Sequence, residues 1–147
     1  MKAIEDLRKA QEAVRQMNHV VSRVQSRQNK YQAEIERLRE GLPELLTAVE
    51  LEEISRRKAD EAKVGIRILE TRMKDIPMIL QGLERRVLLC NYAVKDSIRE
   101  LEKIYKSVKE KLEGDETVNL DDLKTVAEAI GYTEDLKDCL NKIAFNK

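Results

Sequence analysis

The chain has 147 residues, enough for one compact domain with a core of its own. Charged residues make up 38% of it and aromatic residues 3%, a composition typical of helical and coiled-coil proteins and unlike that of sheet proteins. The 28 basic and 28 acidic side chains cancel, which excludes a global field that would draw the protein to nucleic acid or to an anionic membrane.

The first predicted element is a helix over residues 2–41. Its apolar residues recur every seven positions in two sets, and eleven of the twelve positions are apolar or tyrosine. These seam positions are Ala3, Leu7, Ala10, Val14, Met17, Val21, Val24, Gln28, Tyr31, Ile35, Leu38 and Leu42. A repeat sustained at 3.5 residues per turn predicts supercoiling against a partner helix. The single polar member, Gln28, either fixes the register of that pairing or is tolerated because solvent reaches the seam at this position.

The second predicted helix covers residues 43–75. The sequence Gly41-Leu42-Pro43 favours a break, because Gly41 can adopt a left-handed cap and Pro43 suits the first turn of a new helix. From Ala59 a second seven-residue seam emerges and continues to Val108.

The third predicted helix covers residues 77–112 and keeps the phase of this second seam. Pro77 removes one helical hydrogen bond, so two interpretations stay open. Either one long helix from about residue 43 to residue 112 kinks at Pro77, or the chain reverses there, with Asp75 capping a new helix of a three-helix bundle. The absence of glycine around Pro77 and the unbroken phase favour the kink.

The segment from residue 114 to residue 147 is predicted to be an acidic helical hairpin. Gly114 begins a turn, Asn119 can cap a short helix, Gly131 can end it, and Thr133 can cap the last helix. Short helices are marginal alone, so their apolar residues must be buried. We therefore expect an all-α fold: a long antiparallel hairpin or three-helix coiled-coil bundle over residues 1–113, with this small hairpin appended.

Three sets of residues are candidates for binding. The interaction seam is represented by Val14, Val21, Val24, Ile35, Leu38, Ile66, Leu69, Leu80, Leu83 and Val87. A basic patch, from a stretch without acidic residues between Ala13 and Ala33, consists of Arg15, Arg23, Arg27 and Lys30. An acidic face on the C-terminal hairpin consists of Asp121, Asp122, Glu128, Glu134, Asp135 and Asp138.

Catalytic and metal-binding motifs are not found. His19 is the sole histidine, and Gln16 rather than glutamate stands one turn before it, which excludes the Glu-x-x-His pairs of di-iron bundles. The turn after Gly114 resembles the second half of an EF-hand loop, but Lys111 replaces the first carboxylate, which argues against calcium. We expect no cofactor, no metal and no enzymatic activity.

The remaining sequence features concern the cellular location of the protein. Residues 87–90 form the longest apolar run, and the first residues lack the apolar stretch of a signal peptide, so we expect a cytoplasmic protein without membrane spans. Cys90 and Cys139 lie far apart in the sequence and are interpreted as buried, reduced thiols.

These patterns predict a non-enzymatic coiled-coil protein that binds other proteins as a scaffold, adaptor or inhibitor and forms homo-oligomers. One alternative is a nucleic-acid-associated protein that uses the basic patch, although four such charges give only weak, salt-sensitive binding. Another is an inhibitor of the small phage or prophage type that uses the acidic face.

Overall fold

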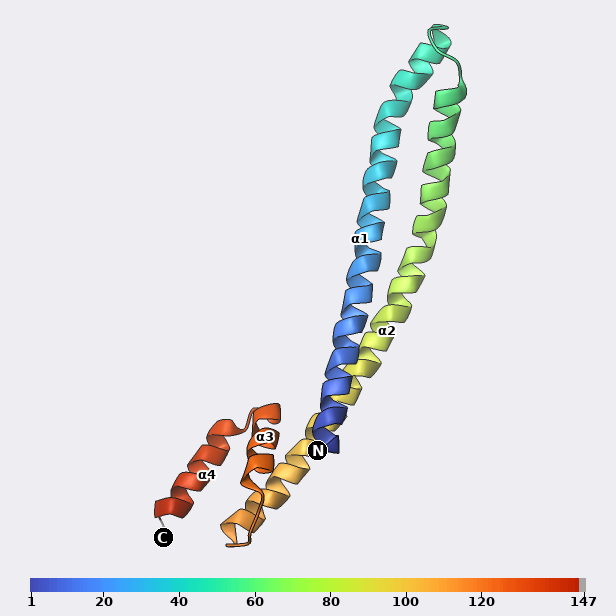
Figure 1. The fold of residues 1–147 in the computed structure, drawn as a ribbon. Coiled ribbons are helices and arrows are strands. Elements are labelled where there is room, and N and C mark those ends of the chain that lie inside the picture. The colour runs from blue at the N-terminus through green and yellow to red at the C-terminus, as the bar shows by residue number, and fades with distance from the viewer. Residues whose placement is uncertain (146–147) are drawn as a thin grey trace. The chain divides into compact units, whose positions relative to one another are not determined.

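The computed structural model describes residues 1–145, which contain four helices and no strand (Figure 1). They are α1 (Lys2–Glu50), α2 (Arg57–Glu113), α3 (Leu120–Ile130) and α4 (Thr133–Phe145). The all-α class is confirmed, with α1 and α2 closely packed as an antiparallel hairpin. The three-helix bundle is wrong, because the chain forms two long helices and the turn between them lies after Glu50.

Two compact units make up the fold. The long-helix unit, Gln16–Val87, holds the later part of α1 and the first part of α2. The terminal unit combines Met1–Arg15 with the chain from Leu88 onward, and so includes α3 and α4. The terminal unit therefore contains residues on both sides of the predicted boundary at Glu113. The separate behaviour predicted for residues 114–147 stays a prediction.

The predicted helix break at Gly41-Leu42-Pro43 is wrong, because α1 continues through Pro43 to Glu50. A proline inside a helix costs about 3 kcal/mol in lost hydrogen bonding and steric strain. Here Leu42, Leu45 and Val49 are half-buried on the same face of α1, and their burial offsets that cost. The predicted second helix does not exist as such, since residues 43–50 belong to α1, residues 51–56 form a turn, and residues 57–75 belong to α2.

The chain reverses instead over residues 51–56, which contain neither glycine nor proline. Glu52 adopts a left-handed conformation with φ of 61°, and the amide of Glu53 donates to the carbonyl of Ala48 at 2.9 Å. Such a left-handed cap usually requires glycine. A glutamate at this position gives no sequence signal, which is why the turn was not predicted.

The helix α2 runs through Pro77 without ending. One helix therefore passes through Pro77 as the single-helix interpretation predicted, although it begins at Arg57 rather than near residue 43, and the reversal at Pro77 is wrong. Pro77 lies on the exposed face, whereas Ile76 and Leu83 on the seam are buried. The burial of seam residues before and after the proline keeps the helix in phase despite the missing hydrogen bond.

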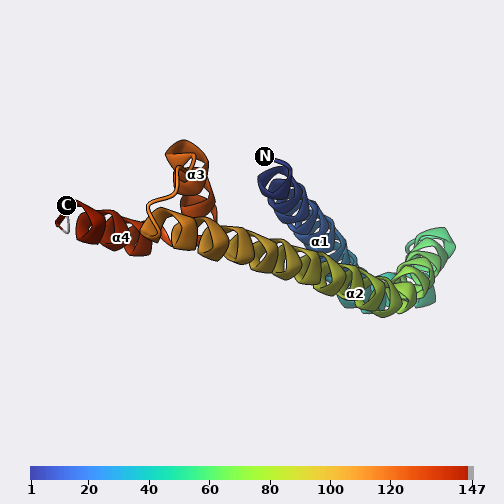
Figure 2. The ribbon, with the colours of Figure 1, turned by 90° about the horizontal axis from the view of Figure 1, so that it is seen from below.

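The core of the terminal unit joins all four helices. It consists of Ile4, Leu7, Leu101, Tyr105, Leu123, Val126, Ala127 and Leu136. Figure 2 shows α3 lying beside the C-terminal part of α2. The rings of Tyr105 and Tyr132 also meet edge to face, with centroids 5.2 Å apart. The short helices are thus buried against the long ones, as their marginal length requires.

The predicted caps of α3 are confirmed. The side chain of Asn119 accepts a hydrogen bond from the amide of Asp122 at 3.2 Å. Gly131 is left-handed with φ of 78°, and the next amide, of Tyr132, donates to the carbonyl of Ala127 at 2.7 Å. The predicted turn after Glu113 is also present, but Asp115, with φ of 63°, takes the left-handed conformation there.

Candidate protein-binding groove

The two predicted seams face each other within the long-helix unit. Every seam position of α1 from Met17 to Leu42, and of α2 from Ala59 to Val87, is buried or half-buried. Of the predicted interaction residues in this unit, those buried are Ile35 and Leu83, and those half-buried are Val21, Val24, Leu38, Ile66, Leu69, Leu80 and Val87. Val14, in the terminal unit, is half-buried as well. Two helices cover a seam from one side only, which leaves these side chains partly in contact with solvent.

Small side chains tighten the seam next to the turn. Ala59 is fully buried, and a β-carbon added to Gly65 would lie 3.3 Å from a methyl carbon of Leu38. Arg39 of α1 also forms an ion pair with Glu70 of α2. Because alanine and glycine occupy little space, they let the two helices approach closely here.

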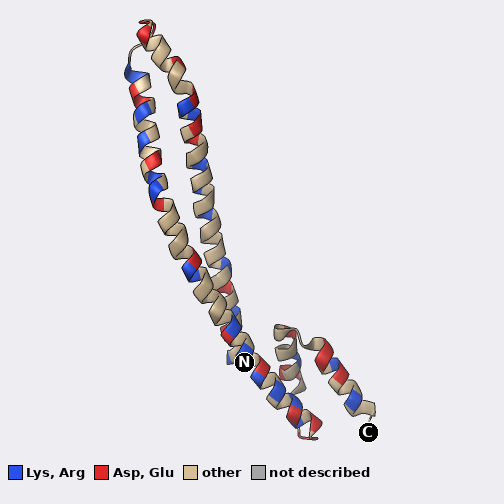
Figure 3. Cartoon of the chain, turned by 180° about the vertical axis from the view of Figure 1, so that it is seen from behind, with Lys and Arg blue, Asp and Glu red and all other residues tan. Residues whose placement is uncertain are grey.

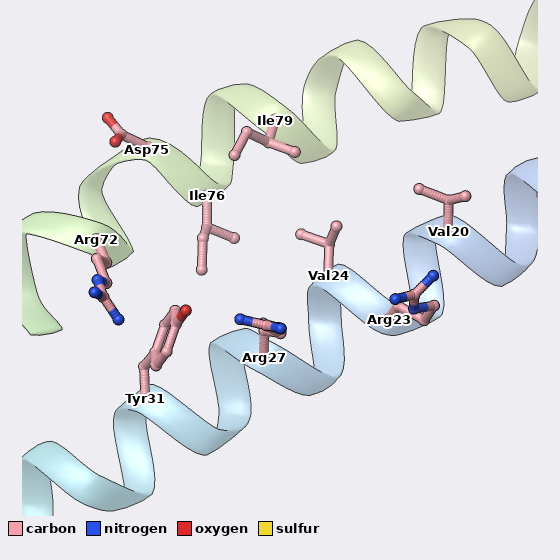
Figure 4. Close-up of a pocket in the computed structure, with 9 residues that line it drawn as sticks. All are labelled: Val20, Arg23, Val24, Arg27, Tyr31, Arg72, Asp75, Ile76 and Ile79. Atoms are coloured by element: carbon pink, nitrogen blue, oxygen red, sulfur yellow. The ribbon is translucent and has the colours of Figure 1, made fainter.

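Farther from the turn, larger side chains line an open groove of about 330 Å³ between α1 and α2 (Figure 4). This arginine groove is lined by Val20, Arg23, Val24, Arg27, Tyr31, Arg72, Asp75, Ile76 and Ile79. Ile76 is buried and Val24 half-buried, so they form its apolar floor. Val20 and Ile79 are 38% and 47% exposed, which shows that the apolar lining continues to the surface.

The groove carries an excess of positive charge. Three arginines and one aspartate line it, which leaves two uncompensated positive charges. Among residues 1–145, no carboxylate forms an ion pair with Arg23, Arg27 or Arg72. In Figure 3 the middle of α1, which has no acidic residue between Ala13 and Ala33, is free of red. An apolar floor bordered by unpaired arginines favours a ligand that is both apolar and anionic.

Tyr31 links the arginines at one end of the groove. The side chain of Arg27 hydrogen-bonds to its phenol, and Arg72 approaches from α2. Both guanidinium groups stabilise the phenolate, so the pKa of Tyr31 lies below its usual range, with the Arg27 hydrogen bond as the largest cause. Positive charge from both helices therefore gathers near Tyr31.

The predicted basic patch is only partly brought together. Arg23 and Arg27 line the groove, whereas Lys30 is exposed outside it. Arg15 belongs to the terminal unit and pairs with Glu12 at 2.8 Å. Sequence reasoning missed Arg72, because its position depends on how α2 is aligned against α1.

The predicted acidic residues lie on two helices. Asp121, Asp122 and Glu128 are exposed on α3, and Glu134 and Asp138 are exposed on α4. Asp135 differs, since it accepts hydrogen bonds from the Tyr105 hydroxyl at 2.5 Å and the Lys109 ammonium at 3.0 Å. Asp135 therefore attaches α4 to α2 within its own unit.

The electrostatics of this attachment follow from its contacts. The hydrogen bonds from Tyr105 and Lys109 stabilise the carboxylate, so the pKa of Asp135 lies below its usual range. Burial, followed by the hydrogen bond to Asp135, raises the pKa of Tyr105. Burial is also the main cause of the raised pKa of the Cys139 thiol, whose sulfur lies 3.6 Å from Glu113 Oε1.

Within residues 1–145, the structure does not complete a metal site around the histidine or the cysteines. His19 is exposed on α1, and the described residues contain no cluster of three or more histidine, cysteine or acidic side chains arranged to hold a metal ion. Cys139 is buried as expected, whereas Cys90 is only half-buried. No helix within residues 1–145 is both long and apolar enough to cross a membrane.

Comparison with known proteins adds no family to this description. No protein-family model matches the chain, and neither a curated protein nor a solved structure matches it. The assignment of a function therefore depends on the residues of the groove and its surroundings.

Proposed function

We propose that this protein is a non-enzymatic, cytoplasmic interaction protein that binds a helix of another polypeptide along the uncovered side of its long-helix unit. The observation that carries this proposal is the arginine groove, where apolar side chains remain exposed between unpaired arginines. A helix laid into this groove would bury Val20 and Ile79 further, for about 1 kcal/mol each. Helix-in-groove binding is a common way for helical proteins to recognise each other.

The partner that we propose is a further copy of the chain, so that the protein forms homo-oligomers. The half-buried seam along α1 and α2 supports this, because a seven-residue apolar repeat is usually covered from more than one side. Scaffolding, adaptor binding and inhibition of a partner are all served by such a surface.

Self-association tests the proposal. Sedimentation equilibrium should show oligomers at about 100 μM protein, a concentration that reveals even weak binding. The double variant V20D/I79D places two carboxylates on the exposed apolar border and should shift the protein to monomer. The matched control L51D/I54D changes two exposed apolar residues near the turn and should not. A wild-type protein that remains monomeric would contradict self-association, and an unaffected V20D/I79D would contradict the groove.

Nucleic-acid binding is the second candidate, because Arg72 joins Arg23 and Arg27 in one groove. Arginine clusters bind phosphates, but the apolar floor between these arginines is suited to side chains rather than to a sugar-phosphate backbone. The groove therefore supports protein binding better.

A further inference from the structure

The arginine groove has two chemically different ends. Arg27, Tyr31 and Arg72 lie at one end, whereas Val20, Ile79 and a single arginine, Arg23, lie toward the other (Figure 4). Asp75, its one acidic lining residue, points away from α1 in this view. A helix that fits the groove therefore needs its acidic side chains at the end with two arginines, whereas an apolar side chain suits the end where Val20 and Ile79 lie near Arg23.

The exposed stripe of α4 has this polarity. Glu134, Asp138, Asn141 and Phe145 are spaced by four, three and four residues, which places them on one side of the helix. All four are exposed, and Phe145 is 91% exposed, more than any other large apolar side chain described. Glu134 and Asp138 form no ion pair within residues 1–145. This stripe thus carries two negative charges and an apolar end that nothing in its own unit uses.

The spacing of the stripe also matches that of the groove. On α1, the residues Tyr31, Arg27, Val24 and Val20 follow one another by four, three and four positions in the opposite direction. If α4 runs antiparallel to α1, Glu134 lies beside Tyr31 and Arg72, and Asp138 lies beside Arg27. Phe145 then lies at Val20 and Ile79. A parallel arrangement would place the aromatic ring between two arginines and leave the two carboxylates with Arg23 alone.

We propose that α4 of a second copy of this chain lies in the arginine groove, antiparallel to α1, with Glu134 and Asp138 paired to Arg72 and Arg27. The inference rests on the proposed function and gives its partner a chemical identity. Charge complementarity carries it, since two excess positive charges in the groove meet two unpaired carboxylates on the stripe. Two grooves placed face to face would instead bring like-charged arginines together.

Charge reversal on both sides tests this contact. The variant R27E/R72E reverses the groove, and E134R/D138R reverses the stripe; each should weaken self-association by about tenfold or more. A mixture of the two variants should associate again, because the reversed stripe of one chain complements the reversed groove of the other. F145A, which leaves the groove unchanged, should also weaken self-association. Raising the salt from about 0.1 M to about 0.5 M should weaken wild-type association, since screening shortens the range of these charges.

Two control variants separate this contact from general charge effects. R85E/R86E reverses two exposed arginines of α2 outside the groove, and E40R/E44R reverses two exposed glutamates spaced by four on α1. Both should associate like the wild type. Circular dichroism checks folding, and the milder variants R27Q/R72Q and E134Q/D138N, which should lose part of the association, replace any variant that is misfolded.

The outcomes distinguish this inference from the proposed function. If both reversed variants associate as the wild type does, the α4 contact is overturned, while association through the apolar seam stands. The contact is equally overturned if each reversed variant is monomeric but their mixture is not restored. If the wild type is monomeric at all concentrations, self-association itself is wrong, and the contact with it.

Discussion

Asp135 shows how one residue of the acidic face differs from its neighbours in role. Its carboxylate accepts hydrogen bonds from Tyr105 and Lys109, whereas Asp138, one turn further on, is exposed and has no ion-pair partner in residues 1–145. Sequence alone placed both residues in one acidic face, because their types and spacing are equivalent. The distinction requires the position of α4 against α2.

The attachment through Asp135 predicts an acid-sensitive contribution to stability. Because the pKa of Asp135 is lowered in the folded state, its contribution is complete above the unfolded pKa of about 4 and is lost as pH falls through the lowered folded value. The variant D135N should lower the free energy of unfolding at neutral pH by about 1 kcal/mol, a modest value because solvent reaches half of this side chain.

Urea unfolding at several pH values checks this effect. The difference between wild type and D135N should shrink as the pH falls below about 4. E128Q, which changes an exposed carboxylate of the acidic face on α3, is the matched control and should behave like the wild type at every pH. A pH-independent difference for D135N would show that its carboxylate charge contributes nothing.

At the scale of elements, α1 shows that packing can override a local break signal. Pro43 stands inside the helix and the reversal occurs over residues 51–56, where Glu52 takes a conformation that favours glycine. Leu42, Leu45 and Val49 continue the apolar face of α1, and their partial burial requires helical geometry. Local propensity thus predicts the turn at the wrong residues, because it does not include the free energy gained by burying the seam residues.

Replacing Pro43 with alanine therefore has a clear expected result. P43A restores a backbone hydrogen bond in an intact helix, so it should raise the free energy of unfolding by about 1 to 3 kcal/mol. Thermal unfolding followed by circular dichroism measures the change. G41A, in the same stretch of helix, has space for the added methyl group and should stabilise by less, about 1 kcal/mol. A destabilised P43A would mean that the proline has a structural role in this segment.

At the scale of the whole molecule, the terminal unit joins both ends of the chain. Ile4 and Leu7 share a core with Leu123 and Leu136, so residues 2–15 depend for their burial on segments more than a hundred positions away. The predicted boundary at Glu113 treats the last two helices as an appendage. The shared core predicts instead that residues 2–15 depend on α3 and α4 for their stability.

Deleting residues 114–147 tests that dependence. Removal of α3 and α4 uncovers the core around Leu101 and Tyr105, so the amides of residues 2–15 should exchange with solvent faster. The amides of residues 16–87 should keep their protection and serve as the internal control. Unchanged protection of residues 2–15 would support the boundary at Glu113.

The groove also predicts weak nucleic-acid binding by the whole protein. With zero net charge and two excess positive charges in the groove, the chain should bind duplex DNA or RNA more weakly than about 10 μM at about 0.15 M salt. Fluorescence anisotropy with labelled duplexes measures this affinity. Submicromolar binding that R27E/R72E abolishes would instead favour the nucleic-acid function.

The sequence by itself determined the helical class, the two seams and the caps at Asn119 and Gly131, because each of these depends on side chains close together in the chain. Every seam position lies on a covered side of its helix, as the seven-residue repeat predicted. Only the tertiary structure decided where the chain reverses, that Arg72 joins Arg23 and Arg27, and that Asp135 contacts Tyr105. Those features depend on the alignment of one helix against another, which is set by burial over the whole seam and leaves no local signal.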